Sequence, residues 1–377
     1  MKILIACDSF KGCMTSQEVC ENIEKGIHRA NSKHECILYP MADGGEGTAS
    51  VFAQVLGGEM VSMESVDAYG KEIQVEYARK DDVAVMDVAT CIGLNMYPRE
   101  KRNPMIASSC GVGKMMKHAI ANGCKKIIIG LGGSCTNDGG MGLLSEFGID
   151  FYDAKRKKLE PGVYALKRIA YIDKSHFKQP KVECVVACDV QNHLLGKEGA
   201  TYIFGKQKGI FGNQIKEVDS WMERYRNKIL QTFHVDMDIY PGSGAAGGIG
   251  GVLLGVFHAQ MKPGISLLIE QSQIEKDIEN CDFVITGEGQ TDAQTMYGKV
   301  PCGISELALK YHKPTICLSG ALGRGYQDLY EKGMIGIFSS ADRAMSFQQA
   351  LQSGPDKLEA LAFNVMKLID GIKGMEE

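Results

Sequence analysis

The chain has 377 residues, enough for two domains with separate cores. Hydrophobic residues make up 44% and charged residues 23%, which is the balance of a soluble globular protein. A net charge of −4, without any basic run, argues against a nucleic-acid or membrane partner. We therefore expect a cytoplasmic protein that acts on small molecules. The composition leaves monomer and homodimer open.

The N-terminal part of the chain alternates between strand and helix. Residues 2–6 form a short apolar run typical of a buried strand, and Thr15 and Glu18 have the spacing of a capping box at the start of a helix. A second strand is predicted at 36–41. From about Glu59 the period changes, because apolar and polar residues alternate through 73–85 as in antiparallel strands.

Helix and strand alternate again from Gly111 to the end of the chain. In the middle section we predict helices at 112–120, 139–147 and 221–233 and strands at 126–131 and 182–187. In the last hundred residues we predict strands at 282–286, 314–319 and 334–338, a helix at 302–312 and a closing helix from about Pro355.

This order of elements predicts two α/β domains. Strands separated by helices indicate a parallel sheet with helices on both faces. We assign residues 1–60 and 280–377 to one discontinuous domain of this kind. Residues 61–279 are then an inserted α/β domain with a mixed sheet.

Nearly every predicted strand is followed by a loop that combines glycines with carboxylates. Parallel α/β sheets bind ligands beyond the carboxyl ends of their strands, so these loops are expected to meet in one cleft. The acids in these loops are Asp8, Asp43, Glu46, Asp138, Asp189, Glu288 and Asp292. Two like charges ~4 Å apart repel by about 4 kcal/mol at an effective dielectric of 20. A divalent metal that also binds phosphate oxygens would remove this conflict, which favours phosphoryl transfer with Mg²⁺.

Individual residues in the loops can be given roles, each with a simpler alternative. We assign the metal to Asp8, Asp43, Glu46, Glu288 and Asp292, although any one such loop could be only a turn. Asp138 is placed to cap the helix after Gly139.

Two further side chains are candidates for the chemistry itself. Lys11, in a loop directly after a strand, is a point charge for phosphate or carboxylate unless it is a solvated surface lysine. Asp189 follows an apolar run with no glycine beside it, so we predict that it is the catalytic base. The alternative that Asp189 only starts a turn remains open.

Two other functions compete with a kinase. Residues Gly242 to Gly247 match the G-x-G-x-x-G dinucleotide pattern, which would suit a nucleotide-cofactor oxidoreductase, but the preceding residues are a poor strand. The chain could also be a non-catalytic binding protein for small acids, although binding alone does not need so many carboxylates beside glycine-rich loops.

Taken together, the loops resemble those of the type I glycerate kinase family. The matching motifs are Asp8–Gly12, Ala42–Thr48, Gly130–Gly140, Gly242–Gly248 and Thr286–Asp292, and the resemblance covers residues 1 to 370. It implies transfer of the ATP γ-phosphate to D-glycerate with Mg²⁺, with the 2-phosphate favoured over the 3-phosphate as product. It also implies two α/β domains, one of them flavodoxin-like, with the active-site cleft between them.

From the loops and motifs together we assign binding of substrate and phosphate. The residues are Ser9, Gly44, Gly45, Gly133, Ser134, Asn137, Gly287 and Lys208. The chain departs from the family pattern around Asp189, where Gln191 and His193 stand in a stretch that is usually Asn-Pro-Leu, and at Lys206, where proline is usual. These departures leave substrate preference open.

Overall fold

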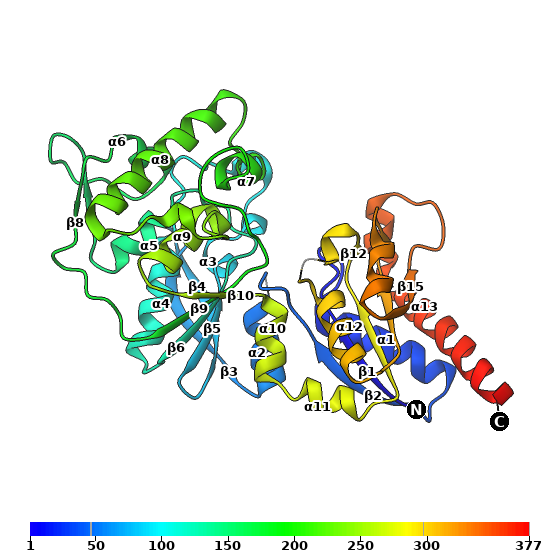
Figure 1. Cartoon of the computed structure of the whole chain (residues 1–377). Helices are drawn as coiled ribbons and strands as arrows, with labels where there is room; N and C mark the ends of the chain where they lie inside the picture. Colours follow the sequence, from blue (N-terminus) through cyan, green and yellow to red (C-terminus); the bar gives the residue numbers. More distant parts are fainter. Residues whose placement is uncertain (46, 297, 377) are drawn as a thin grey trace. The chain divides into compact units, whose positions relative to one another are not determined.

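The computed structural model describes residues 1–45, 47–296 and 298–376, which divide into two compact units (Figure 1). Unit 1 consists of Met1–Asp43 and Pro263–Glu377, and unit 2 is Gly44–Lys262. The boundaries thus lie at 43/44 and 262/263 rather than at 60/61 and 279/280. Helix α2 (Thr48–Leu56) belongs to unit 2 because it packs on strands of the unit 2 sheet.

Unit 1 is built on a parallel sheet of five strands. These are β1 (Lys2–Cys7), β2 (Glu35–Pro40), β11 (Phe283–Gly287), β13 (Thr315–Ser319) and β15 (Met334–Ser339), in the spatial order β15-β13-β11-β1-β2. Numbered along the chain, that order is 2-1-3-4-5, which is the flavodoxin-like arrangement. Strand β1 pairs with β11, so residues from both ends of the chain share one sheet.

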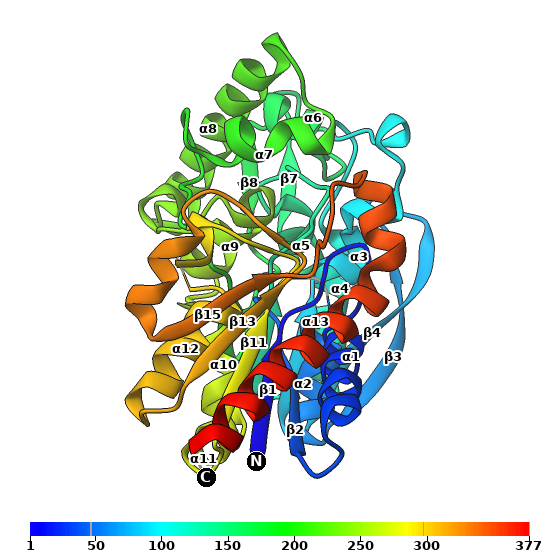
Figure 2. The ribbon, with the colours of Figure 1, turned by 90° about the vertical axis from the view of Figure 1, so that its right-hand side faces the viewer.

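Helices cover both faces of this sheet, as alternating strands and helices predict. On one face, Ile3 and Ile5 of β1 share a core with Ile23 of α1 (Ser16–Ala30) and Leu358 of α13 (Phe347–Glu376). Figure 2 shows α13 running across this face beside α1. On the other face, Cys302 of α12 (Val300–Lys310) packs with residues of β13 and β15. The expected capping box of Thr15 and Glu18 is present at the start of α1.

Shorter elements complete unit 1. They are α10 (Gly264–Gln271), α11 (Ile274–Glu279), the 3-10 helices η5 (Ala293–Met296) and η6 (Tyr326–Lys332), and the paired short strands β12 (Gln290–Thr291) and β14 (Ala321–Leu322).

Helix α13 begins at Phe347, eight residues before the predicted start at Pro355. Proline has no N–H, so Pro355 cannot donate the helical hydrogen bond to the carbonyl of Leu351. That carbonyl instead accepts a hydrogen bond from the Cys13 thiol at 3.1 Å. A side chain from another part of unit 1 therefore compensates the proline, which allows the helix to pass through it.

Unit 2 is built on a mixed sheet of six strands in the order β10-β9-β6-β5-β4-β3. Strands β3 (Glu59–Val66) and β4 (Glu72–Lys80) are antiparallel, as their alternating pattern predicts, and β4 is antiparallel to β5 (Val83–Asp87). Strands β6 (Lys126–Gly130), β9 (Glu183–Ala187) and β10 (Gln260–Lys262) extend the sheet in parallel with β5.

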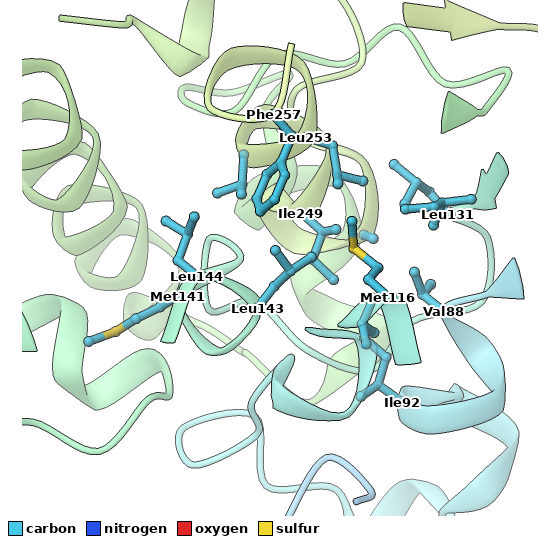
Figure 3. Packing of buried hydrophobic residues seen from close by; sticks show 14 of the residues in the cluster. Val88, Ile92, Met116, Leu131, Met141, Leu143, Leu144, Ile249, Leu253 and Phe257 are labelled. Carbon is cyan, nitrogen blue, oxygen red and sulfur yellow. The ribbon is translucent and has the colours of Figure 1, made fainter. Parts of the chain in front are cut away.

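The core of unit 2 lies between this sheet and several helices. Figure 3 shows Met116 of α4 (Cys110–Ala121), Leu143 of α5 (Met141–Glu146) and Ile249 and Leu253 of α9 (Ile249–Gly255) pointing toward one another. All four side chains are fully buried. This packing fixes the loop between β6 and α5, which carries several of the predicted site residues.

Unit 2 contains elements that the sequence pattern does not predict. They are α3 (Ala89–Ile92), α6 (Val163–Arg168), α7 (Ala200–Lys208), the antiparallel pair of β7 (Asp150–Tyr152) and β8 (Tyr171–Asp173), and the 3-10 helices η1 (Leu94–Met96), η2 (Arg99–Lys101), η3 (Met237–Ile239) and η4 (Ala245–Gly248). Helix α8 (Asn213–Phe233) begins eight residues earlier than predicted. Among the helices of the described residues, none has the length and apolar character that crossing a bilayer requires.

Candidate functional site

A cavity of about 340 Å³ lies in unit 1, lined by residues that follow the carboxyl ends of β1 and β11. In the 2-1-3-4-5 strand order these two strands meet at the switch point, where flavodoxin-like sheets bind ligands. Cys7 is the register partner of Gly287, so the next residues, Asp8 and Glu288, leave the sheet side by side. The polar residues that argue for a ligand site here are Asp8, Ser9, Lys11, Asp43, Glu288 and Lys299.

Two acids of this cavity, Asp8 and Glu288, are held in an environment that resists their ionisation. Burial and the neighbouring charge of Asp43 raise the pKa of Asp8 to about 7, although Lys11 and the backbone N–H of Ser9 oppose the shift. Burial also raises the pKa of Glu288, against the opposing effect of Lys299. A bound cation or a closer basic group would stabilise the ionised form of both carboxylates and lower their pKa values.

Two lysines partly neutralise the acids. The Lys11 ammonium lies 3.2 Å from a carboxylate oxygen of Asp43, and its side chain is 70% exposed. Burial would lower the pKa of Lys11, but the charges of Asp43 and Asp8 more than offset this and raise it. Lys299 lies 3.1 Å from Glu288, whose side chain also accepts a hydrogen bond from Thr295. Lys11 is therefore the more accessible cation for an incoming phosphate.

The donor set suits a hard divalent cation that is bound together with phosphate. Mg²⁺ is usually held by one or two carboxylates, with phosphate oxygens and waters in its other positions. Asp8, Asp43 and Glu288 line the cavity and can supply those carboxylates. Among the described residues, the only three ligand side chains with atoms within 4.8 Å of one another are Glu24, His28 and Cys36, away from this cavity. The described residues of unit 1 thus offer carboxylates for a metal shared with phosphate, and they form no closed cage around the cavity.

Three predicted residues of the same loops lie differently. The Asp292 carboxylate accepts hydrogen bonds from the Gln290 side chain at 3.0 Å and from the Gln294 backbone at 2.9 Å, and Asp292 does not line the cavity. A Cβ atom at Gly287 would lie 2.1 Å from the Leu318 carbonyl oxygen, so strand packing alone requires this glycine. Glu46 lies outside the described residues.

A second polar cluster lies in unit 2, where Lys208 is buried at the end of α7. Its ammonium donates to the Ser134 hydroxyl at 3.0 Å and to the Thr136 carbonyl oxygen at 2.6 Å. Burial lowers the pKa of Lys208 to about 8. The loop after β6 thus holds a buried cation at the carboxyl end of a parallel strand, which is the position expected for an anion-binding residue.

The same loop contains polar atoms that no described residue satisfies. The Asn137 amide nitrogen donates to Thr201 at 3.0 Å, but the Asn137 Oδ1 and Thr136 Oγ1 atoms are buried without a hydrogen-bond partner among the described residues. Unsatisfied buried polar atoms are costly, and in native proteins they often mark a place for water or a ligand.

Asp138 holds this loop together. Its fully buried carboxylate accepts hydrogen bonds from the backbone and hydroxyl of Ser109 and from the backbones of Gly140 and Gly142. These donors belong to the starts of α4 and α5, so Asp138 caps two helices where the sequence suggested one. Its role is structural.

Close backbone packing and positive φ angles explain why glycine occupies the predicted binding positions of unit 2. Gly44 has a φ of +85°, and a Cβ atom there would lie 2.7 Å from the Ala187 carbonyl oxygen. Gly45 is so close to Gly132 that a Cβ at Gly132 would lie 2.6 Å from the Gly45 Cα. Gly133, with a φ of +73°, is exposed. Residues 44 and 45 therefore run directly over the ends of β6 and β9.

Asp189 lies in unit 2, two residues beyond the end of β9, and is half-buried. Strand β9 ends at Ala187, as predicted, so only Cys188 separates Asp189 from the end of the strand. Gln191, His193 and Lys206 are exposed. Lys206 is thus exposed, whereas Lys208, two residues further along α7, is buried.

The Gly242–Gly247 loop does not form a dinucleotide site. The residues before it form the 3-10 helix η3 and no strand. A Cβ atom at Gly247 would lie 2.1 Å from the Thr136 carbonyl oxygen, so the loop is filled by the neighbouring backbone and leaves no place for a pyrophosphate. The glycines serve packing against the loop after β6.

Sequence reasoning missed two residues that the structure makes prominent. Lys299 faces Glu288 in the unit 1 cavity, and only its place after Gly298, just before a helix with Pro301, could have drawn attention to it. Asp87 ends β5 and accepts hydrogen bonds from the backbones of Gly47 and Ala49, so it caps α2. Its position at a strand end was the available signal.

The two units define a class of protein: a two-part α/β enzyme with a flavodoxin-like unit and an inserted mixed-sheet unit. A sequence model described as "Glycerate kinase family" matches residues 3–370. The chain belongs to the glycerate kinase family, and it is therefore an enzyme that acts as a kinase. The oxidoreductase and the non-catalytic binding protein are excluded as its class.

Similar proteins agree with this assignment. The chain is 36% identical to a glycerate kinase of Bacillus cereus, with 97% of each sequence covered. It is 35% identical to a glycerate 2-kinase of Escherichia coli, again with 97% of each covered. A crystal structure from Salmonella typhimurium LT2, described under the name glycerate kinase 2, is 34% identical, covers 99% of both chains and superposes with a TM-score of 0.85.

Proposed function

We propose that this enzyme transfers the γ-phosphoryl group of ATP to the 2-hydroxyl group of D-glycerate and releases 2-phosphoglycerate and ADP. The observation that carries the proposal is the pair Asp8 and Glu288, which leave β1 and β11 together at the switch point of a flavodoxin-like sheet. The E. coli relative named glycerate 2-kinase supports the choice of hydroxyl. A cytoplasmic location fits these substrates.

The phosphates of ATP are proposed to lie at the acidic end of the unit 1 cavity. Lys11 is exposed there and can bind a phosphate oxygen, while Ser9 offers its hydroxyl. Asp8, Asp43 and Glu288 would hold Mg²⁺, whose charge offsets that of the phosphates when it is bound. The raised pKa values of Asp8 and Glu288 support this, because the two acids lack enough positive charge of their own. For Glu46 and Asp292 the metal role stays a prediction.

Binding of the acid substrate is proposed for the unit 2 loop after β6. Lys208 provides a buried positive charge, and Ser134 and Asn137 provide a hydroxyl and an amide beside it. The unsatisfied Asn137 Oδ1 atom supports a polar ligand at this loop. For Gly44, Gly45, Gly133 and Gly287 the binding role stays a prediction, in which backbone N–H groups approach the ligand.

Asp189 remains the proposed catalytic base. Phosphoryl transfer depends mainly on positioning and on charge stabilisation, but a carboxylate that accepts the proton of the attacking hydroxyl contributes further. The position of Asp189 beyond the carboxyl end of a parallel strand supports this role. Asp43 is the second candidate.

The test is a coupled assay with ATP and D-glycerate. Enolase used as the coupling enzyme, without a mutase, reports only 2-phosphoglycerate, so a signal there with none from a 3-phosphoglycerate assay supports the choice of hydroxyl. Turnover should stop when a chelator removes Mg²⁺. Full turnover in excess chelator would refute the metal, and no turnover with D-glycerate would refute the substrate.

Variants separate the proposed roles. Asp189→Asn should lower kcat by roughly 10²–10⁴ with little change in KM for ATP. Lys11→Ala should raise KM for ATP, because it removes binding in both the ground and the transition state. Lys206→Ala changes an exposed lysine and is the matched control. A folded Asp189→Asn variant with normal kcat would move the base to Asp43.

A further inference from the structure

The unit 1 cavity has an apolar half that the phosphoryl chemistry does not use. Beyond the acids, its wall is formed by Phe10, Met345, Phe347, Ala350 and Leu351. Most of these residues come from the start of α13 and the segment just before it. The cavity therefore has two kinds of surface: charged at the ends of β1 and β11, and mainly apolar along α13, where Lys357 also lines the cavity.

The apolar half does not suit glycerate. Each of the three carbons of glycerate carries oxygen, so the molecule has no apolar surface to bury, and it is small beside a cavity of about 340 Å³. A nucleotide has both kinds of surface, because a flat aromatic base and a ribose are joined to charged phosphates. Ligand pockets are typically apolar with a few placed polar groups, and an aromatic base fits such a wall.

We infer that the apolar half of this cavity binds the base and ribose of the nucleotide, so that unit 1 is the nucleotide-binding unit. The inference rests on the proposed function for the identity of the phosphoryl donor. It adds the subsite: the phosphates lie at Asp8, Lys11 and Glu288, and the base lies against α13.

Phe347 gives independent support. It is the first residue of α13, and its side chain is 77% exposed, more than any other aromatic side chain in the described residues. Leaving so large an apolar ring in water is unfavourable, but at the wall of a cavity it offers a flat face to a ligand. Stacking of a base on an aromatic ring is tolerant of base identity and contributes substantially to binding.

The start of α13 is also held firmly enough to form a wall. The Cys13 thiol binds the Leu351 carbonyl, and a Cβ atom at Gly354 would lie 2.4 Å from the Cys13 sulfur. The first turns of α13 thus pack directly against the loop that follows β1. This contact ties the apolar wall to the same loop that carries Asp8 and Lys11.

Two variants with matched controls test the subsite in the full-length protein. Phe347→Ala removes the exposed ring, and Tyr330→Ala removes another exposed aromatic of unit 1 that does not line the cavity. Ala350→Trp fills the apolar half, and Gln348→Trp places the same side chain on an exposed position of the same helix. Thermal unfolding confirms that each variant is folded.

The readouts are the Kd for ADP with Mg²⁺ by calorimetry and the separate KM values for ATP and D-glycerate. We expect Phe347→Ala to weaken ADP about 5- to 100-fold and Ala350→Trp to weaken it more than about tenfold, with KM for D-glycerate unchanged. Both controls should match the wild type.

The outcomes distinguish this inference from the proposed function. If the wild type binds ADP, the two variants lose it, and D-glycerate is not phosphorylated, the substrate assignment fails and the nucleotide subsite stands. If the variants raise KM for D-glycerate and leave ADP binding intact, the apolar half holds the acid substrate and the inference is overturned. Unchanged ADP binding and kinetics in both folded variants would also overturn it.

Discussion

Replacing Asp8 by Asn should stabilise the enzyme in the absence of ligands while it impairs catalysis. Asp8 is 6% exposed, and its pKa is about 7 in the folded chain against an ordinary value of 3.8. Each pKa unit corresponds to about 1.4 kcal/mol, so ionised Asp8 costs the fold about 4 kcal/mol. Asn keeps an acceptor for the Ser9 N–H, which lies 2.7 Å from the Asp8 carboxylate, and removes the charge.

The sign of the pH dependence follows from the proton counts. Between the ordinary pKa of 3.8 and the folded value of about 7, the native chain holds a proton on Asp8 that the unfolded chain has released. Stability of the wild type therefore falls as pH rises through this window. The gain from Asp8→Asn should be about 2–3 kcal/mol larger at pH 8 than at pH 5.

The assay is urea unfolding of wild type and variant at both pH values, in buffer with a chelator, followed by circular dichroism. Asp328→Asn replaces an exposed aspartate of η6 and should show no such difference. Kinetics on the same samples should show a strong loss of turnover for Asp8→Asn. An equal gain at both pH values, or a loss of stability at pH 8, would refute the proposed burial of charge.

Three further predictions concern unit 2. The free energy of unfolding of the wild type should rise by about 2 kcal/mol between pH 7.5 and 9.5, because the folded chain releases the Lys208 proton near pH 8 and the unfolded chain only near 10.5. Lys208→Met should abolish this rise. Urea midpoints that still rise in the variant would contradict this prediction. Asp138→Ala should lower the free energy of unfolding by about 3–5 kcal/mol, since it leaves buried N–H groups of Ser109 and two glycines without an acceptor. A loss below about 1 kcal/mol would contradict this and show that water replaces the carboxylate. Gly247→Ala should prevent folding or lower stability several times more than Gly196→Ala. Both glycines have positive φ, but only residue 247 would place its Cβ 2.1 Å from a carbonyl oxygen. Thermal unfolding of the two variants makes the comparison, and similar melting temperatures would count against the prediction.

The sequence predicted the features that depend on strand ends. Asp8 and Glu288 follow short apolar runs, and the rule that parallel sheets bind ligands at their carboxyl ends was enough to group them. The antiparallel β3 and β4 followed from a period of two in the apolar residues. Such features are encoded locally, so they can be recognised without knowing the fold.

The features that were missed depend on contacts between distant residues. The start of α13 was misplaced because proline is tolerated in the first turn of a helix but is unfavourable in its interior, and the compensating hydrogen bond from the Cys13 thiol comes from a distant part of the chain. Lys299 was missed because its partner Glu288 lies in a separate loop, and its place after Gly298 was only a weak local signal. The unit boundary at residue 43 was missed because α2 packs on β4 and β5, which lie later in the chain.

The position of β1 in its sheet has a consequence for the order of folding during synthesis. Strand β1 lies between β2 and β11, and β11 follows residues 44–262 in the chain. A ribosome therefore delivers the N-terminal β-α-β segment first, but all of unit 2 must emerge before that segment can pair with β11. Unit 2 is continuous in sequence and can fold while the edge of β1 that later pairs with β11 is still unpaired. Because the cavity also needs the start of α13, Asp8 and Lys11 are among the first residues translated, yet their binding site is among the last parts of the molecule to form.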